Sequence, residues 1–286
     1  MREGIVICPI CGGPLSEISR SFRCPRNHTF DRAREGYVHL LPTGHGRSKI
    51  RGDTAEMVRA RRRFLARGYY EPLTAAVVGR VMSIQREGLT VVDVGCGEGH
   101  AIGRVWAALE PHARDLRPCL IGVDISRDAL RLAARTYKNV LFLINDIGHR
   151  ICVADGSVDV LLDLFAPRNP VEFGRIVRPG GLAVVAIPAE GHLKELRSEL
   201  PLLGIEEEKR ERTIERLRPF FELAEEERFE YARVLDADAV RDLLRMTPNY
   251  WHLNDAVLGA LASTEPRPVT FGFILLSLRR TDVIAG

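Results

Sequence analysis

The sequence predicts an α/β fold in which helices cover a doubly wound, mostly parallel sheet, with a small extra module at the N-terminus. Three observations predict it. Short apolar runs alternate with helix-compatible segments along residues 86–286. A glycine-rich turn directly follows the apolar run at 91–94. Two close pairs of metal-ligand type, one Cys-x2-Cys and one Cys-x3-His, lie within the first 30 residues, a segment too short to hold a core of its own.

The overall composition is that of an ordinary globular protein. The chain has 286 residues, of which 45% are hydrophobic and 28% are charged, and its formal net charge is +3. No apolar run is long enough for a membrane-spanning helix, and the first ten residues hold too short an apolar stretch for a signal peptide. We therefore expect a cytoplasmic protein with no membrane partner. The near balance of charge neither requires nor excludes a nucleic acid partner.

The first 41 residues predict a structural zinc site. Four soft or borderline ligands follow the spacing C-x2-C-x12-C-x3-H, which puts two close pairs on either side of a hairpin-length loop. A redox pair or a disulfide is the alternative. A redox pair normally accompanies a βαβ unit, and none surrounds these residues. The predicted ligands are Cys8, Cys11, Cys24 and His28.

Residues 42–85 predict a basic linker and two helices. The first helix is expected over 54–66, with Asp53 as its cap and Glu56 completing a capping box. The second extends to about residue 85. The dense basic residues can bind a phosphate backbone or form a solvated helix face, and both interpretations stay open. The candidate phosphate contacts are Arg47, Lys49, Arg59, Arg61, Arg62 and Arg63.

The stretch VVDVGCGEGH at 91–100 predicts a buried strand, a glycine turn and a helix N-terminus. Its spacing is G-x-G-x-G, whereas a dinucleotide needs G-x-G-x-x-G. A pyrophosphate bound at this turn would also lie close to Asp93, and the two negative charges would repel each other. A ligand with a cationic end, such as the amino acid part of S-adenosylmethionine, fits better than a dinucleotide or a turn without a ligand. Gly95, Gly97 and Gly99 would let that ligand lie directly on the backbone.

The next elements alternate as a parallel sheet requires. Strands are expected at about 119–123, 140–144, 158–164 and 182–187, with helices at 127–137 and 171–177 between them. Ligands bind at the carboxyl ends of such strands. Asp124 ends the second strand, where an acid would bind a ribose diol, and Asn145 and Asp146 end the third, where an adenine could be read.

The C-terminal part completes the sheet. Strands are expected at 229–234 and 269–278, and helices at 204–218 and 236–246, the first of these being a solvated face. The loop at 247–252 carries two aromatic residues, which could stack on a base or pack in the core.

Three motifs in combination resemble the class I S-adenosylmethionine-dependent methyltransferases. They are DVGCGEG at 93–99, GVD at 122–124 and VRPGG at 177–181. The resemblance implies a seven-stranded sheet with one antiparallel strand.

A closer resemblance covers nearly the whole chain. The cysteine motif, FD at 30–31, EGYV at 35–38, GDTAEMV at 52–58, ARR at 60–62 and MTP at 246–248 are together similar to the bacterial 23S ribosomal RNA guanine-N1 methyltransferases. That family implies a homodimer that binds an RNA hairpin. It also implies a zinc-binding RNA-recognition module at 1–41, the linker at 42–85 and a methyltransferase domain at 86–286. The family includes housekeeping and macrolide-resistance enzymes, and FAPR at 165–168 looks more like the resistance type.

The resemblance also implies the contacts to the cofactor S-adenosylmethionine: Tyr70, Gly97, Glu98, Asp124, Asn145, Asp146 and His192. Guanine N1 carries a proton, so an acceptor should stand near the transferred methyl group. Asp163 is the first candidate and Asp146 the second. The alternatives are a small-molecule methyltransferase with a structural zinc module and a non-catalytic RNA-binding protein.

Overall fold

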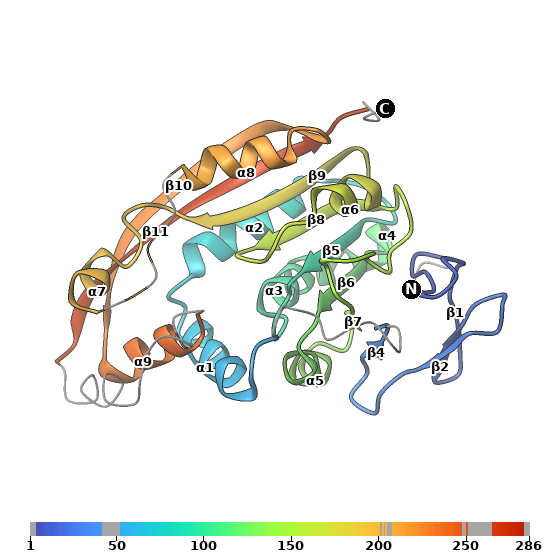
Figure 1. Cartoon of the computed structure of the whole chain (residues 1–286), viewed down its shortest axis with the longest axis horizontal. Coiled ribbons are helices and arrows are strands. Elements are labelled where there is room, and N and C mark those ends of the chain that lie inside the picture. The colour runs from blue at the N-terminus through green and yellow to red at the C-terminus, as the bar shows by residue number, and fades with distance from the viewer. Residues whose placement is uncertain are drawn as a thin grey trace.

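The computed structural model describes residues 4–41, 52–200, 202, 204, 208–247, 250 and 265–282. Within these ranges the chain forms an eight-stranded sheet flanked by helices, and a three-stranded sheet near the N-terminus (Figure 1). None of the helices described is both long and apolar enough to span a membrane. Arg47 and Lys49, two of the candidate phosphate contacts, lie outside the described residues.

The large sheet confirms the predicted fold class. Its strand order is β10-β11-β9-β8-β5-β6-β7-β4, and it is parallel from β9 to β4. β11 is antiparallel to β9, and β10 is antiparallel to β11. The eighth strand, β4, comes from the N-terminal segment and was not predicted. The strands are β4 (Val38–His39), β5 (Thr90–Val94), β6 (Cys119–Asp124), β7 (Leu141–Ile144), β8 (Val158–Leu164), β9 (Val177–Pro188), β10 (Phe221–Leu235) and β11 (Arg267–Arg280).

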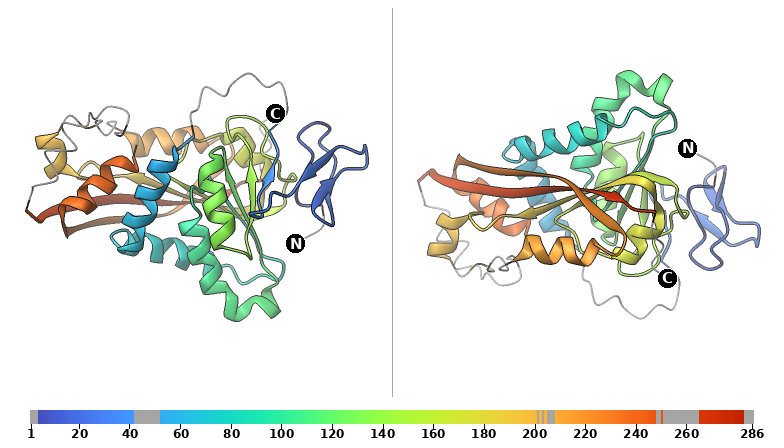
Figure 2. Two further views of the ribbon diagram at one scale, coloured as in Figure 1. Left: turned by 90° about the horizontal axis from the view of Figure 1, so that it is seen from below. Right: turned by 90° about the horizontal axis from the view of Figure 1, so that it is seen from above.

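Helices cover both faces of this sheet, so its central strands, β5 to β8, are buried on both sides. Figure 2 shows α2 and α3 on the opposite side of the sheet from α6 and α8. The helical elements are α1 (Ala55–Ala66), α2 (Glu71–Met82), α3 (His100–Leu109), the 3-10 helix η1 (Glu110–His112), α4 (Ala113–Leu116), α5 (Arg127–Thr136), α6 (Pro170–Ile176), α7 (Lys194–Glu199), α8 (Lys209–Leu217) and α9 (Ala237–Arg245).

Successive residues of the central strand β5 serve two different cores, because side chains along a strand alternate between faces. Val91 packs in the core formed with α2, α3 and α5. Val92 and Val94 pack in the core formed with α6 and the N-terminal module. All five residues of β5 are buried. This explains why the run at 91–94 is apolar at nearly every position and shows no polar alternation.

Two sequence expectations about elements need correction. The N-cap of α1 is Thr54, whose hydroxyl accepts a hydrogen bond from the Met57 N–H at 3.3 Å, and not Asp53. The predicted strand at 229–234 is only the C-terminal part of β10, and the one at 269–278 falls two residues short of β11 at each end. β10 lies at the edge of the sheet and is mostly exposed, so its polar residues obscured its full length in the sequence.

The N-terminal module carries a sheet formed by β1 (Ser16–Ile18), β2 (Ser21–Arg23) and β3 (Thr29–Asp31). It is attached to the loop that follows β7. The Ile7 N–H donates to the Cys152 carbonyl at 3.1 Å, and the Ala154 N–H donates to the Ile5 carbonyl at 2.9 Å. Phe22 of β2 is fully buried in the core that the module shares with the large sheet. The module and the sheet therefore pack as one body.

Candidate cofactor cavity and metal site

A cavity of about 660 Å³ lies at the carboxyl ends of the parallel strands. That volume is ordinary for a small-molecule site. β5, at its centre, pairs with β8 on one side and β6 on the other, which is where the strand order reverses. Nine of the ten predicted cofactor residues line it, and Gly99 does not. The nine are Tyr70, Asp93, Gly95, Gly97, Glu98, Asp124, Asn145, Asp146 and His192.

The turn at 95–99 requires glycine at three positions, for its backbone conformation and for close packing. Gly95, Gly97 and Gly99 have φ values of +69°, +54° and +82°, a region that side chains with a Cβ rarely adopt. A Cβ on Gly95 would lie 2.4 Å from the Ala166 Cβ, and so neighbouring chain would have to move. Gly99 has a packing role, because a Cβ there would lie 3.1 Å from Phe142. The turn therefore leaves bare backbone facing the cavity.

Asp124 is held rigidly at the end of β6. Its two carboxylate oxygens accept hydrogen bonds from the Gly97 N–H at 2.9 Å and the Ser126 N–H at 2.7 Å. Each oxygen can accept a second hydrogen bond. The acid is thus fixed by the glycine turn, with acceptor capacity left for a ligand hydroxyl.

Buried carboxylates give the cavity a strong preference for cations. Burial raises the pKa of Asp93, Glu98 and Asp124, and for Asp93 the neighbouring acids raise it further. An added negative ligand group would be repelled here, whereas a cation would be stabilised. S-adenosylmethionine carries an ammonium and a sulfonium, so the donor set fits that molecule and disfavours a pyrophosphate.

The side chain of Asn145 supports the loop after β7. Its Oδ1 accepts a hydrogen bond from the Cys152 N–H at 2.9 Å. Asp146, the next residue, accepts one from the Gly148 N–H at 2.8 Å and lines the cavity. Because the carbonyl of Cys152 accepts from Ile7, this loop joins the cavity to the zinc module.

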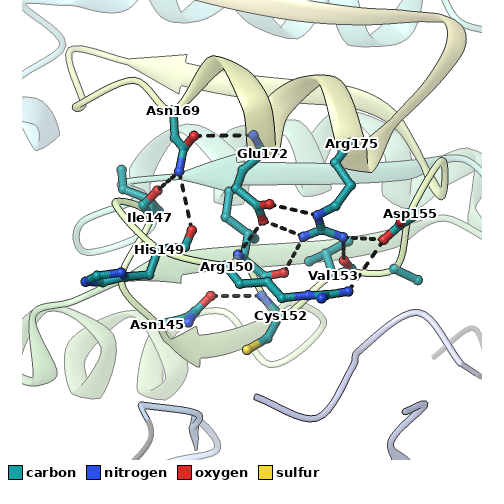
Figure 3. A network of polar contacts seen from close by, with 12 residues as sticks. Asn145, Ile147, His149, Arg150, Cys152, Val153, Asp155, Asn169, Glu172 and Arg175 are labelled. Atoms are coloured by element: carbon teal, nitrogen blue, oxygen red, sulfur yellow. Dashed lines mark hydrogen bonds and ion pairs between the residues drawn. The ribbon is translucent and has the colours of Figure 1, made fainter. Parts of the chain in front are cut away.

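Arg175 anchors the same loop to α6 (Figure 3). Its guanidinium donates to the carbonyls of Ile151 and Val153 at 2.7 and 2.8 Å. It also contacts the carboxylates of Glu172 and Asp155, both at 2.5 Å. Glu172 in turn accepts from the Ile151 N–H at 2.7 Å. One side chain therefore satisfies four acceptors that position the wall of the cavity.

We expect Arg175→Gln to lower the free energy of unfolding by about 2–4 kcal/mol, because it leaves a paired carboxylate and two carbonyls without their donor. Urea denaturation followed by circular dichroism measures the change. Arg114→Gln, on the exposed side of α4, is the matched control. Equal, small effects of the two substitutions would show that the network does not hold the loop.

Aromatic side chains form one wall of the cavity. The Tyr70 ring lies 4.8 Å from Phe273 and 6.2 Å from Phe165, and His192 lies 4.8 Å from Phe273. Phe165 is 43% exposed, unusual for so large an apolar side chain. Burial raises the pKa of the Tyr70 hydroxyl, which stays neutral. The sequence pointed to Phe165 only as part of the FAPR motif and did not single out Phe273. This wall offers flat apolar surface for a purine.

His192 makes the protein sensitive to acid. Its Nδ1 accepts from the Gly272 N–H at 3.3 Å, and burial, with a smaller effect of Arg197, lowers its pKa to about 3. Between pH 6.5 and 3 the unfolded chain therefore binds one proton that the folded chain does not, so stability falls as pH falls.

We expect His192→Asn to reduce the slope of unfolding free energy against pH in this window by about 1.4 kcal/mol per unit. Urea titrations from pH 7 to 4 measure it, with the exposed His112→Asn as control; identical slopes in all three proteins would contradict it.

Asp163 is not where a proton acceptor should be. It is fully buried beneath the loop 164–168 and does not line the cavity. One oxygen lies 3.0 Å from Arg168 Nε, and the other accepts from the Ala166 N–H at 3.2 Å. Burial, partly offset by Arg168, raises its pKa to about 7. Asp163 therefore holds this loop through its contacts with Arg168 and Ala166.

The basic helix α1 is less open than the sequence suggested. Arg63 donates to both carboxylate oxygens of Asp242 on α9, at 2.9 and 2.5 Å. Arg61 points into the cavity and contacts Asp53. Arg59 and Arg62 remain on the exposed face. Of the predicted loop at 247–252, residues 248, 249, 251 and 252 lie outside the described part of the chain.

The four predicted metal ligands come together in the N-terminal module. The ligand atoms of Cys8, Cys11, Cys24 and His28 all lie within 4.8 Å of one another. Cys11 Sγ is 3.6 Å from Cys24 Sγ, and His28 Nδ1 is 3.5 and 3.4 Å from the sulfurs of Cys8 and Cys24. Tetrahedral zinc with Zn–S bonds of about 2.3 Å needs S···S separations of about 3.8 Å. The cluster thus fits a closed structural zinc site.

Comparisons with known proteins match both parts of the chain. A family model described as "RlmA, N-terminal" matches residues 6–49, and a methyltransferase domain model matches 85–217. The chain is 39% identical over 259 residues to the 23S rRNA (guanine(748)-N(1))-methyltransferase of Streptomyces fradiae, covering 88% of this chain and 89% of that protein. It is 37% identical over 283 residues to a "Putative 23S rRNA (guanine-N(1)-)-methyltransferase" of Micromonospora griseorubida, with 92% of each covered.

A chain of the solved "Complex between the Haloferax volcanii Trm112 methyltransferase activator and the putative methyltransferase" has a similar fold. The TM-score is 0.50 at 18% identity, and the match covers 82% of this chain and all of the matched chain. At that identity the likeness concerns the fold alone.

Proposed function

Because the chain belongs to the family of 23S rRNA (guanine-N1)-methyltransferases, we propose that it transfers a methyl group from S-adenosylmethionine to N1 of a guanine in a 23S rRNA hairpin. The observation that carries the proposal is the similarity at 39% identity that spans the zinc module and the catalytic domain together. A cavity with a glycine turn and buried carboxylates supports it.

The cavity residues have separate roles in this proposal. Asp124 binds the ribose diol, Asn145 lies where the adenine is read, and Tyr70 and His192 form the aromatic wall. Asp93, Glu98 and the glycine turn hold the amino acid part. When bound, the cofactor supplies a methyl group already activated by its sulfonium. What the protein adds is mostly alignment of the guanine N1 with that methyl group.

Asp146 is our candidate for the proton acceptor, since it lines the cavity at the end of β7 and Asp163 does not. Asp146→Asn keeps the hydrogen bond from Gly148 but removes the base. We expect kcat to fall by 10²–10⁴-fold, the usual contribution of a general base. Isothermal calorimetry should show cofactor affinity changed by less than tenfold. If kcat is retained, the proton goes elsewhere.

We assign RNA binding and methyl transfer to different parts of the chain. The zinc module at 1–41 and the linker at 42–85 position the RNA, and 86–286 carries out the methyl transfer. Arg59 and Arg62, on the exposed face of α1, are the proposed phosphate contacts, with a homodimer framing the hairpin. Macrolide resistance is the proposed biological role, by analogy with the tylosin-type branch of the family.

Methyl transfer in vitro tests this function. Tritiated S-adenosylmethionine is incubated with a 23S rRNA hairpin transcript, with the same transcript carrying adenine at the target, and with a panel of small-molecule acceptors. The proposal predicts label in the guanine-containing transcript alone. Label in small molecules but not in RNA would favour a small-molecule enzyme, and no label in any acceptor would favour a binding protein.

A further inference from the structure

We propose that Arg61 of α1 binds the carboxylate of the cofactor's amino acid part, and so belongs to the cofactor site and not to the RNA surface. The proposal rests on the proposed function, since it deepens the description of the same cavity. It starts from the position of Arg61 on its helix. The buried side chains of α1 include Met57, Val58 and Phe64. Arg61 follows Met57 by four residues and precedes Phe64 by three, so it lies on the same buried face.

The guanidinium of Arg61 lies on the glycine turn. A Cβ on Gly97 would be 3.0 Å from Arg61 Nη1. The same guanidinium contacts Asp53 and donates from Nη2 to the Met246 carbonyl at 2.8 Å. These two contacts, from segments far apart in the sequence, fix the guanidinium over the turn and leave N–H donors facing the cavity.

Other described cations line the cavity, but their contacts direct them elsewhere. Arg168 pairs with the buried Asp163. Arg197 contacts the Glu190 carbonyl. Lys209 begins α8, on the other face of the sheet from α2 and α3. Among the cations of the described lining, Arg61 is the one that contacts the glycine turn.

Charge balance makes a cation necessary at this point. Glu98 and Asp124 both act electrostatically on Arg61, and Asp93 lies buried close by. These acids suit the ammonium and sulfonium of S-adenosylmethionine. The same molecule carries a carboxylate on the carbon that bears the ammonium, and beside a row of acids that carboxylate would be repelled. Arg61 supplies the opposite charge, with planar paired donors that match a carboxylate.

Two ligands that differ only in this carboxylate test the proposal: S-adenosylmethionine and decarboxylated S-adenosylmethionine. Calorimetry on the full chain should show that the wild type prefers the first by at least tenfold. Arg61→Gln should weaken S-adenosylmethionine by at least tenfold, change the decarboxylated ligand by less than threefold and so abolish the preference. Arg61→Lys should restore part of it. Arg114→Gln, on the exposed side of α4 and outside the cavity lining, is the matched control and should bind both ligands as the wild type does.

Each other outcome has a distinct meaning. If Arg61→Gln weakens both ligands equally, Arg61 only joins Asp53 to Met246, and the proposal is overturned. A wild-type protein without any preference overturns it too, independently of whether the variants fold. If the wild type binds neither ligand, the proposed methyltransferase function itself fails. If the wild type methylates the hairpin but shows no preference between the two ligands, only the proposed role of Arg61 is overturned.

Discussion

Gly97→Val is expected to abolish detectable binding of S-adenosylmethionine, with a loss of at least 100-fold in affinity, or about 3 kcal/mol. Gly97 has a φ of +54°, which a β-branched residue adopts only with strain. Gly97 also has no Cβ, and the Arg61 guanidinium lies close to the position that a Cβ would take: Arg61 Nη1 would be 3.0 Å from it. The valine methyl groups would enter the cavity at the place proposed for the amino acid part. Calorimetry with purified protein measures the loss.

Gly79→Ala is the control for this experiment. Gly79 lies on the exposed side of α2, and a Cβ there would meet no atom within 4 Å. Alanine favours a helix over glycine, so this variant should be slightly more stable and bind the cofactor as the wild type does. Near-normal affinity of Gly97→Val, with its melting temperature unchanged, would mean that the cofactor does not lie on the glycine turn.

Cys24→Ser should remove zinc from the protein and stop methylation of the rRNA hairpin, by at least 100-fold. Cys24 is buried at the centre of the metal cluster, and its sulfur lies within 3.6 Å of Cys11 Sγ and 3.4 Å of His28 Nδ1. Short metal modules depend on the ion for their folding energy. Metal analysis after dialysis against a chelator should give one zinc per wild-type chain, from the single cluster found among the described residues, and nearly none in the variant.

Cofactor affinity should change far less in Cys24→Ser, by under tenfold, because the four metal ligands lie outside the cavity lining. The module reaches the cavity through backbone contacts, such as the Ile7–Cys152 hydrogen bond and the β4–β7 pairing. Cys119→Ala, in the buried strand β6, is the control and should keep both zinc and activity. If the zinc-free variant methylates the hairpin at the wild-type rate, the module does not position the RNA.

The sequence predicted the parallel strands β5 to β8 well, because each of them is a short apolar run that ends at a turn or a polar residue. Asp93 and Asp124 lie near the carboxyl ends of β5 and β6, and Asn145 directly follows β7; parallel strands bring these ends to one edge. That geometry is enough to predict that these residues meet. The zinc ligands were equally predictable, since the spacing of Cys8, Cys11, Cys24 and His28 is that of a metal site and their ligand atoms do come together.

Other features depend on contacts that no local pattern contains. The two-residue strand β4 forms because Val38 and His39 pair with β7, about 100 positions later in the sequence. A strand end also does not reveal whether an acid such as Asp163 faces the cavity or is buried beneath it. The position of Arg61 on the apolar face of α1 could have been predicted from the helical spacing. The neighbouring arginines, however, made the whole helix resemble a phosphate-binding surface.

Primer extension across 23S rRNA tests the central claim most directly, because a methyl group on guanine N1 blocks the pairing edge that reverse transcriptase copies. The rRNA should come from a strain that lacks this modification and expresses either the wild type or Gly97→Val. We predict a stop next to a single hairpin guanine with the wild type, and read-through with the variant. The same stop in both strains, or read-through in both, would contradict methyl transfer from this cavity to 23S rRNA.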